Sequence, residues 1–169
     1  MWLRTSRFAA VEAMATATLT LGPDAGSFYD RGCARRATGR PQPALEDYHQ
    51  ALTMYRQAGH RGNEAATLNN IGLVYANLGD RQRGLDHYQQ ALPILREVGD
   101  RAGEAVTRYN IAMVHRADGD LDQAIRELER VVDLDRQVGH PDLEADTRVL
   151  QQLRRERAED PRSGPLPGP

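Results

Sequence analysis

The chain has 169 residues, and its 22 basic and 24 acidic side chains give a formal charge of -2 at neutral pH. This balance excludes a general attraction to nucleic acid or to an anionic membrane surface. The basic side chains are all arginines, which excludes lysine-dependent chemistry such as a Schiff base or a P-loop. The single cysteine, Cys33, excludes an internal disulfide and a cysteine-rich metal site, and it fits a reducing cytoplasm.

The first segment, residues 1–22, has two open interpretations. Two arginines precede a stretch of small and apolar residues that loosely resembles a targeting peptide, although Glu12 interrupts the stretch and no clean cleavage site ends it. Phe8 also stands 40 residues before Tyr48, which is one full period of the repeat described next. The segment is therefore predicted to be either a targeting peptide or the remaining helix of a lost hairpin that caps the apolar edge of the following repeat.

A period of 40 residues organises the rest of the chain. Glycines, a glutamate, an alanine, a threonine and an aliphatic residue return at this spacing, which is far more agreement than chance gives. The recurring sets are Gly59, Gly99 and Gly139; Glu64, Glu104 and Glu144; Ala65, Ala105 and Ala145; Thr67, Thr107 and Thr147; Gly39, Gly79 and Gly119; and Leu45, Leu85 and Ile125.

Each repeat predicts two helices separated by a tight turn. In the middle repeat, Leu68, Ile71 and Tyr75 follow the i, i+3, i+7 spacing of one helix face. Gly79 and Gly99 break the pattern and are expected in the left-handed conformation that ends a helix. No segment alternates in the manner of a strand, so no strand is predicted. The predicted helices cover 25–38, 43–58, 63–78, 82–98, 103–118, 122–138 and 142–158.

One hairpin alone leaves its apolar stripe uncovered, so successive hairpins are expected to stack. The last residues are rich in proline and glycine and are expected to be disordered. The predicted organisation is a repeat array over 23–158, made of repeats at 25–62, 63–102 and 103–141 and a capping helix at 142–158, followed by a tail at 159–169.

The middle repeat carries a specific pattern, which is Leu68, Ile71, Gly72, Tyr75, Gly79, Tyr88 and Ala91. This pattern resembles a tetratricopeptide repeat, and the 40-residue period is similar to the longer repeats of kinesin light chains, spindle-orientation adaptors and bacterial signalling regulators. The resemblance implies an all-α fold, namely an α-solenoid of three helical hairpins with a partial N-terminal helix and a C-terminal capping helix.

The resemblance also predicts how each hairpin packs. Tyr75 and Tyr88 are expected to fill the wedge between hairpins, with hydroxyl groups that reach the surface. Gly84 stands where the other repeats have alanine, so Gly84→Ala is expected to stabilise the fold by roughly 0.5–1 kcal/mol through the unfolded state. The small residues expected where the paired helices approach closely are Gly72, Ala112, Ala44 and Ala124.

No catalytic, cofactor-binding or metal-binding motif occurs, so the sequence predicts no enzyme, no cofactor and no metal site. His60 and His140 hold the same turn position 80 residues apart and are interpreted as solvated turn histidines. The glutamates of the repeat start helices, where a carboxylate complements the helix dipole, so a structural role is favoured over acid–base catalysis.

In the family that the chain resembles, the first helix of each hairpin lines a concave groove that binds partners. Asn70 and Asn110 stand two residues before the small residue of that helix, so they are expected either to bond a bound peptide backbone or to bond neighbouring helices only. The groove positions implied by the resemblance are Tyr29, Arg36, Asn69, Asn70, Leu73, Asn77, Tyr109, Asn110, Met113 and Arg116.

The sequence therefore predicts a cytoplasmic protein-interaction module, a scaffold or sensor in a bacterial regulatory system. Arg36 and Arg116 favour an acidic protein or peptide partner. The alternative is a receptor for a small signalling peptide that controls a regulator. Neither nucleic acid nor a membrane is expected as a partner, and uncovered ends of the array are expected to allow self-association.

Overall fold

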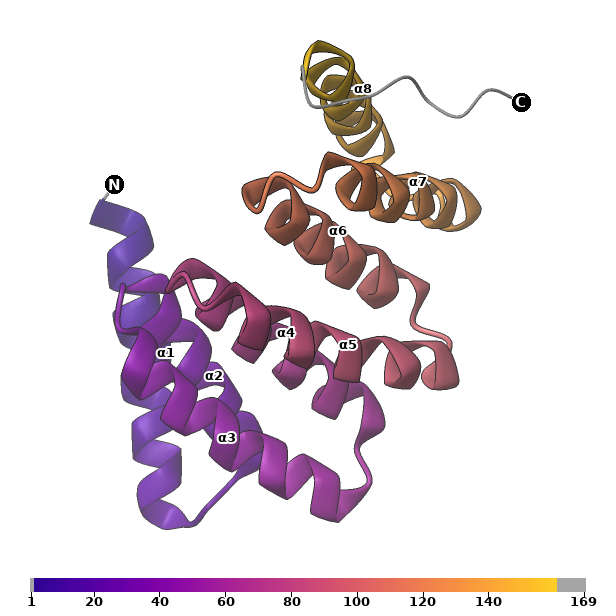
Figure 1. Cartoon of the computed structure of the whole chain (residues 1–169). Coiled ribbons are helices and arrows are strands. Elements are labelled where there is room, and N and C mark those ends of the chain that lie inside the picture. The colour runs from indigo at the N-terminus through magenta and orange to yellow at the C-terminus, as the bar shows by residue number, and fades with distance from the viewer. Residues whose placement is uncertain (1, 161–169) are drawn as a thin grey trace. The chain divides into compact units, whose positions relative to one another are not determined.

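A computed structural model describes residues 2–160, and within them the chain folds into eight helices and no strand (Figure 1). This all-α fold confirms the fold class that the sequence predicts. The helices are α1 (Trp2–Leu21), α2 (Ala25–Ala37), α3 (Pro41–Ala58), α4 (Arg61–Asn77), α5 (Arg81–Val98), α6 (Arg101–Ala117), α7 (Leu121–Val138) and α8 (Leu143–Glu159). The expected tail lies outside the described residues from residue 161 onward. In the described part of the chain, no helix combines the length and the apolar character needed to cross a membrane.

Local sequence explains where the helices begin and end. Asp24 and Asp100 cap α2 and α6, because their carboxylates accept hydrogen bonds from the N–H groups of Ser27 and Gly103 at 2.7 and 2.8 Å. A glycine stands at the end of each helix from α2 to α7, either directly after the helix or one residue beyond its cap. These glycines are 20 residues apart, and their φ angles lie between 65° and 86°. This left-handed conformation confirms the prediction for the turns at residues 79 and 99.

The chain divides into two compact units, Met1–Val98 and Gly99–Pro169. In the first unit, α2 pairs with α3, α4 pairs with α5, and α3 packs on α4, so two hairpins stack. In the second unit, α6 pairs with α7, and α8 packs on α7. Each predicted repeat is therefore a helical hairpin, and the predicted capping helix is α8.

The core of the first unit contains two completely buried tyrosines, Tyr48 and Tyr88. The Tyr48 hydroxyl donates to the sulfur atom of Cys33 at 3.4 Å, so the cysteine has a packing role in the core. The Tyr88 hydroxyl is buried and has no hydrogen-bond partner among the described residues. The expectation that the Tyr88 hydroxyl reaches the surface is therefore wrong, because the second hairpin closes over it.

Glycines at positions 72 and 84 allow the paired helices α4 and α5 to approach closely around the buried Tyr88 side chain. A Cβ atom on Gly72 would lie 2.7 Å from Cε1 of Tyr88, and one on Gly84 would lie 3.1 Å from the carbonyl oxygen of Gly72. The second of these neighbours is backbone, which cannot move aside as a side chain does. Gly84 is therefore a contact residue between α4 and α5, and this contact opposes the stabilisation expected of Gly84→Ala, which stays a prediction.

Helix α1 packs on α2 through one face. Phe8, Val11 and Leu19 are half-buried and Ala15 is buried, which is a helical stripe. On the same face, Glu12 forms ion pairs with arginines at positions 35 and 40, the first at 3.2 Å. These contacts account for an arginine at position 35, where the middle repeat has an aromatic residue. Whether α1 serves as a cap or as a targeting segment stays a prediction.

Candidate functional site

Buried and half-buried charges in this chain are paired with few exceptions. Asp47, whose side chain is 3% exposed, accepts from Arg31 at 2.7 Å and lies 3.0 Å from Arg35. Buried Glu64 pairs with two arginines in the same unit. Buried Arg108 pairs with two glutamates in the second unit. Because an unpaired buried charge is costly, the exceptions to this pattern are the candidate positions for binding.

The first exception is Arg36 on α2. Seven arginines of the described chain are buried or half-buried, and Arg36 is the one for which no carboxylate lies within ion-pair distance. Its Nε atom is buried without a hydrogen-bond partner. Burial raises the pKa of Tyr48 and of Tyr88 well above the usual range. A hydrogen bond with Arg36 and the Arg36 charge partly offset the shift of Tyr48, and the Arg36 charge partly offsets that of Tyr88. The guanidinium group therefore lies between the hairpins with its charge uncompensated by the described residues.

The other predicted groove residues of the first unit lie on α2 and α4. Asn70 donates one amide hydrogen to the Tyr29 hydroxyl at 2.9 Å and one to the Ala66 carbonyl at 3.2 Å. Burial raises the pKa of Tyr29 to about 12, so its hydroxyl stays protonated. Asn70 thus uses both donors within the unit and keeps only its carbonyl oxygen to accept from a ligand. Nearby on α4, Asn69 and Leu73 are half-buried and Asn77 is exposed.

The groove residues predicted for the second unit all lie on α6. Tyr109 and Met113 are half-buried against the apolar cluster of that unit. Asn110 is half-buried, and it interacts with other residues of the chain. Arg116 is paired with Glu156 of α8 at 2.5 Å. The Arg116 charge is therefore largely balanced within the unit, in contrast to that of Arg36.

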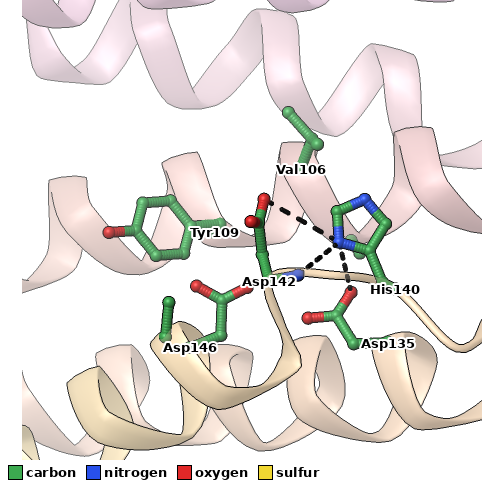
Figure 2. Close-up of a pocket in the computed structure, with 8 residues that line it drawn as sticks. Val106, Tyr109, Asp135, His140, Asp142 and Asp146 are labelled. Carbon is green, nitrogen blue, oxygen red and sulfur yellow. Dashed lines mark hydrogen bonds and ion pairs between the residues drawn. The ribbon is translucent and has the colours of Figure 1, made fainter.

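The second exception is a group of carboxylates around a pocket of about 290 Å³ in the second unit (Figure 2). The sequence did not predict this pocket. It lies between α6, the end of α7 and the start of α8. Three carboxylates and one imidazole supply its polar groups, and small or apolar side chains and one tyrosine supply its walls. The lining residues are Ala105, Val106, Tyr109, Asp135, His140, Asp142, Ala145 and Asp146.

The repeat itself explains why this pocket exists. Position 135 corresponds to Tyr55 and Leu95 in the two earlier repeats, and both of those side chains are core residues. In the first unit, the Tyr55 ring packs against the ring of His60 at 6.2 Å between centroids. In the second unit, Asp135 replaces the large side chain beside His140 and leaves space. The same comparison at a 40-residue shift would have found this change in the sequence.

A delayed helix start completes the pocket. Helices α4 and α6 begin 40 residues apart at Arg61 and Arg101, but α8 begins at Leu143, two residues later than that period predicts. The extra turn includes Pro141 and carries Asp142, whose side chain makes no capping hydrogen bond. His140, which was expected to be a solvated turn residue, is half-buried and lines the pocket. A search of the described residues finds no cluster of carboxylate, imidazole and thiol groups with metal-site geometry.

Comparison with known proteins agrees with this architecture. Residues 63–137 match the sequence family described as tetratricopeptide repeat. No curated protein sequence matches the chain. In the structure of apo RapI, a similar fold is found with a TM-score of 0.78 and 14% identity over 87% of this chain. The chain spans 56% of the length of that RapI chain.

Two further structures share the fold at low identity. BtubC (BKLC) from P. vanneervenii gives a TM-score of 0.69 and 17% identity, and the match covers 99% of this chain and 80% of that one. The Podosopora anserina structure described as a putative kinesin light chain with nearly identical TPR-like repeats gives a TM-score of 0.66 and 20% identity. That match covers 92% of this chain and 79% of the other. At such identities these likenesses show the fold alone. The family match over residues 63–137, together with the hairpins described above, identifies a tetratricopeptide-repeat region in this chain.

Proposed function

We propose that the chain is a non-enzymatic interaction module that binds an acidic, extended or short helical segment of a partner protein against α2 and α4. Tetratricopeptide repeats are modules for binding proteins or peptides, and the more specific partner is inferred from the charges. The observation that carries the proposal is the uncompensated guanidinium group of Arg36. A carboxylate of a partner would pair with that group and remove the cost of leaving it unpaired.

The neighbouring side chains suit a peptide backbone. Asn70 is fixed by its bond to Tyr29, and its carbonyl oxygen is left to accept from a peptide N–H group. Leu73 adds half-buried apolar surface on the same helix. In the second unit, Asn110 and Met113 of α6 stand at the same repeat positions as Asn70 and Leu73, and they are proposed as a contact of that unit's own with the partner. In a cell, we expect a cytoplasmic scaffold or sensor of a bacterial regulatory system.

The test begins with a partner recovered by affinity pull-down from native lysate, whose binding segment is mapped with overlapping peptides. Arg36→Gln is expected to weaken binding of that segment by about tenfold or more, since a charge-assisted hydrogen bond contributes about 1.5–3 kcal/mol. Asn70→Ala combined with Asn110→Ala is expected to weaken it by about 1 kcal/mol for each hydrogen bond lost. Fluorescence anisotropy with the labelled segment measures both effects.

Arg83→Gln is the matched control, because Arg83 is an exposed arginine of the same unit that already pairs with the carboxylate of Asp80 at 3.2 Å. It should bind as tightly as the wild-type chain. Wild-type affinity in both the Arg36 and the double asparagine variants would contradict the groove assignment and direct attention to α3 and α5. A binding segment from a short exported peptide, rather than from a large protein, would favour the receptor alternative.

A further inference from the structure

The pocket of the second unit contains a carboxylate that the chain does not satisfy. Asp135 is 1% exposed, and its Oδ2 atom has no hydrogen-bond partner among the described residues. Figure 2 shows its carboxyl group facing that of Asp146, with His140 on its other side. The other buried or half-buried carboxylates discussed above each have at least one arginine partner, whereas buried Asp135 and half-buried Asp146 have none in the described chain, and neither has the exposed Asp142 beside them.

His140 is the basic group beside these carboxylates. Its Nδ1 atom accepts the backbone N–H of Asp142 at 3.2 Å. The same atom lies 3.9 Å from Oδ1 of Asp135 and 3.8 Å from Oδ2 of Asp142, which are ion-pair distances beyond the range of a hydrogen bond. The imidazole ring therefore makes no hydrogen bond to either carboxylate, and both are available to a partner from outside.

The aspartate at position 135 is expected to lower the stability of the second unit. The repeat places Tyr55 and Leu95 at the equivalent positions, and both are at most 5% exposed. An apolar residue there would close the pocket and avoid burying a charge. A departure from the repeat that weakens the fold at a pocket is typical of a functional site.

We propose that this pocket binds the cationic side chain of a partner peptide, an arginine in the first instance. Its guanidinium group would lie between Asp135 and Asp146, where a planar group with several N–H donors pairs with two carboxylates at once. Its methylene stem would pack on Ala105, Val106 and Tyr109 of α6. The pocket volume of about 290 Å³ accepts a side chain rather than a large cofactor. This inference rests on the proposed role in binding partner segments, but it concerns other residues and needs no identified partner.

The protonation of Asp146 makes the binding depend on pH. Burial, a hydrogen bond of its protonated carboxyl group with Asp135, and the nearby Asp135 and Asp142 charges raise the pKa of Asp146 to about 6, and the nearby His140 opposes this shift. The groups that face it are Tyr109 from α6, Asp135 from α7, and His140 and Asp142 from the turn before α8. Below pH 6 the Asp146 carboxyl group holds a proton and attracts a cation weakly, and above pH 6 it is charged. Affinity for a cation is therefore expected to rise between pH 5 and pH 7.

The experiment is a nuclear magnetic resonance titration of the full chain, in the presence of EDTA, with N-acetylarginine methylamide. The citrulline analogue has nearly the same shape without the charge and serves as the control ligand. We expect saturable shifts of the amides at residues 139–146 with the arginine probe and none with citrulline. Guanidinium ion alone should bind more weakly, because it lacks the stem. Equal shifts with citrulline, or equal affinity for guanidinium ion, would overturn the assignment to a cationic side chain.

Variants assign the effect to the pocket. Asp135→Asn and Asp146→Asn should each weaken binding of the arginine probe about tenfold or more. Asp133→Asn removes the same charge from an exposed position two residues away and should leave binding unchanged. Asp135→Leu should abolish binding and raise the melting temperature, because it restores the apolar residue of the repeat. Unchanged binding in both Asn variants, or a lower melting temperature in Asp135→Leu, would contradict a pocket kept for a ligand.

Discussion

Gly72→Ala is expected to destabilise the first unit by about 3 kcal/mol, because an added methyl group in a packed core forces its neighbours apart. The Cβ atom would lie 2.7 and 2.8 Å from two ring carbons of Tyr88 and 3.0 Å from the Gly84 carbonyl oxygen. Tyr88 is completely buried and has no free space in which to rotate away. Chemical denaturation followed by circular dichroism measures the loss.

The third hairpin supplies the compensating change. There, Ala112 and Leu128 stand at the positions of Gly72 and Tyr88, and both are completely buried. Tyr88→Leu should therefore relieve the clash, so that the double variant loses less than the sum of the two single variants by about 1 kcal/mol or more. Gly62→Ala is the control, since a Cβ atom there meets nothing within 4 Å. Unchanged stability in Gly72→Ala would contradict the close approach of α4 and α5.

Arg108→Leu is expected to destabilise the second unit by about 3 kcal/mol, because it removes the buried positive charge that balances two poorly exposed carboxylates. Arg108 has a side chain that is 6% exposed, and it pairs with Glu104 at 2.9 Å and with Glu127. The loss is expected even though leucine is the residue that α4 carries at the equivalent position, where Leu68 is 1% exposed.

The surroundings of the leucine decide the outcome. Glu127 stands where the second hairpin has His87, so a leucine at position 108 would face a carboxylate that α5 does not present. The α4 counterpart of Glu104 is Glu64, which pairs with arginines at positions 56 and 61 instead. Adding Glu127→Gln to Arg108→Leu should recover part of the stability. Arg130→Leu is the control, because Arg130 pairs with the same Glu127 at 3.2 Å but is 60% exposed and should change stability little. Equal losses in the Arg108 and Arg130 variants would show that burial of the pair is unimportant.

The sequence predicted the fold well because each hairpin is built from local patterns. The 40-residue period and the glycines at positions 79 and 99 determine the helices and their ends, and neither depends on contacts distant in sequence. The packing between the helices was predicted less well from the sequence. The roles of Gly84 and Tyr88 depend on how closely α4 approaches α5, and a repeat pattern does not report that distance.

The candidate sites were predicted in part. Arg36 and Asn70 were found through the resemblance, but the bond from Asn70 to Tyr29 and the isolation of the Arg36 charge follow only from the structure. The carboxylate pocket does not follow from the residues that recur in the repeat. The informative residue, Asp135, is one that fails to recur.

Hydrogen–deuterium exchange of the chain, with and without its mapped partner segment, tests the central proposal of partner binding most directly. Binding at the predicted surface should slow exchange in α2 and α4, including the amides around Arg36 and Asn70, and should leave the exposed side of α3 and α5 unchanged. A segment that is basic should also protect residues 139–146. Protection confined to α3 and α5 would contradict the proposal, since neither Arg36 nor the pocket lies on those helices.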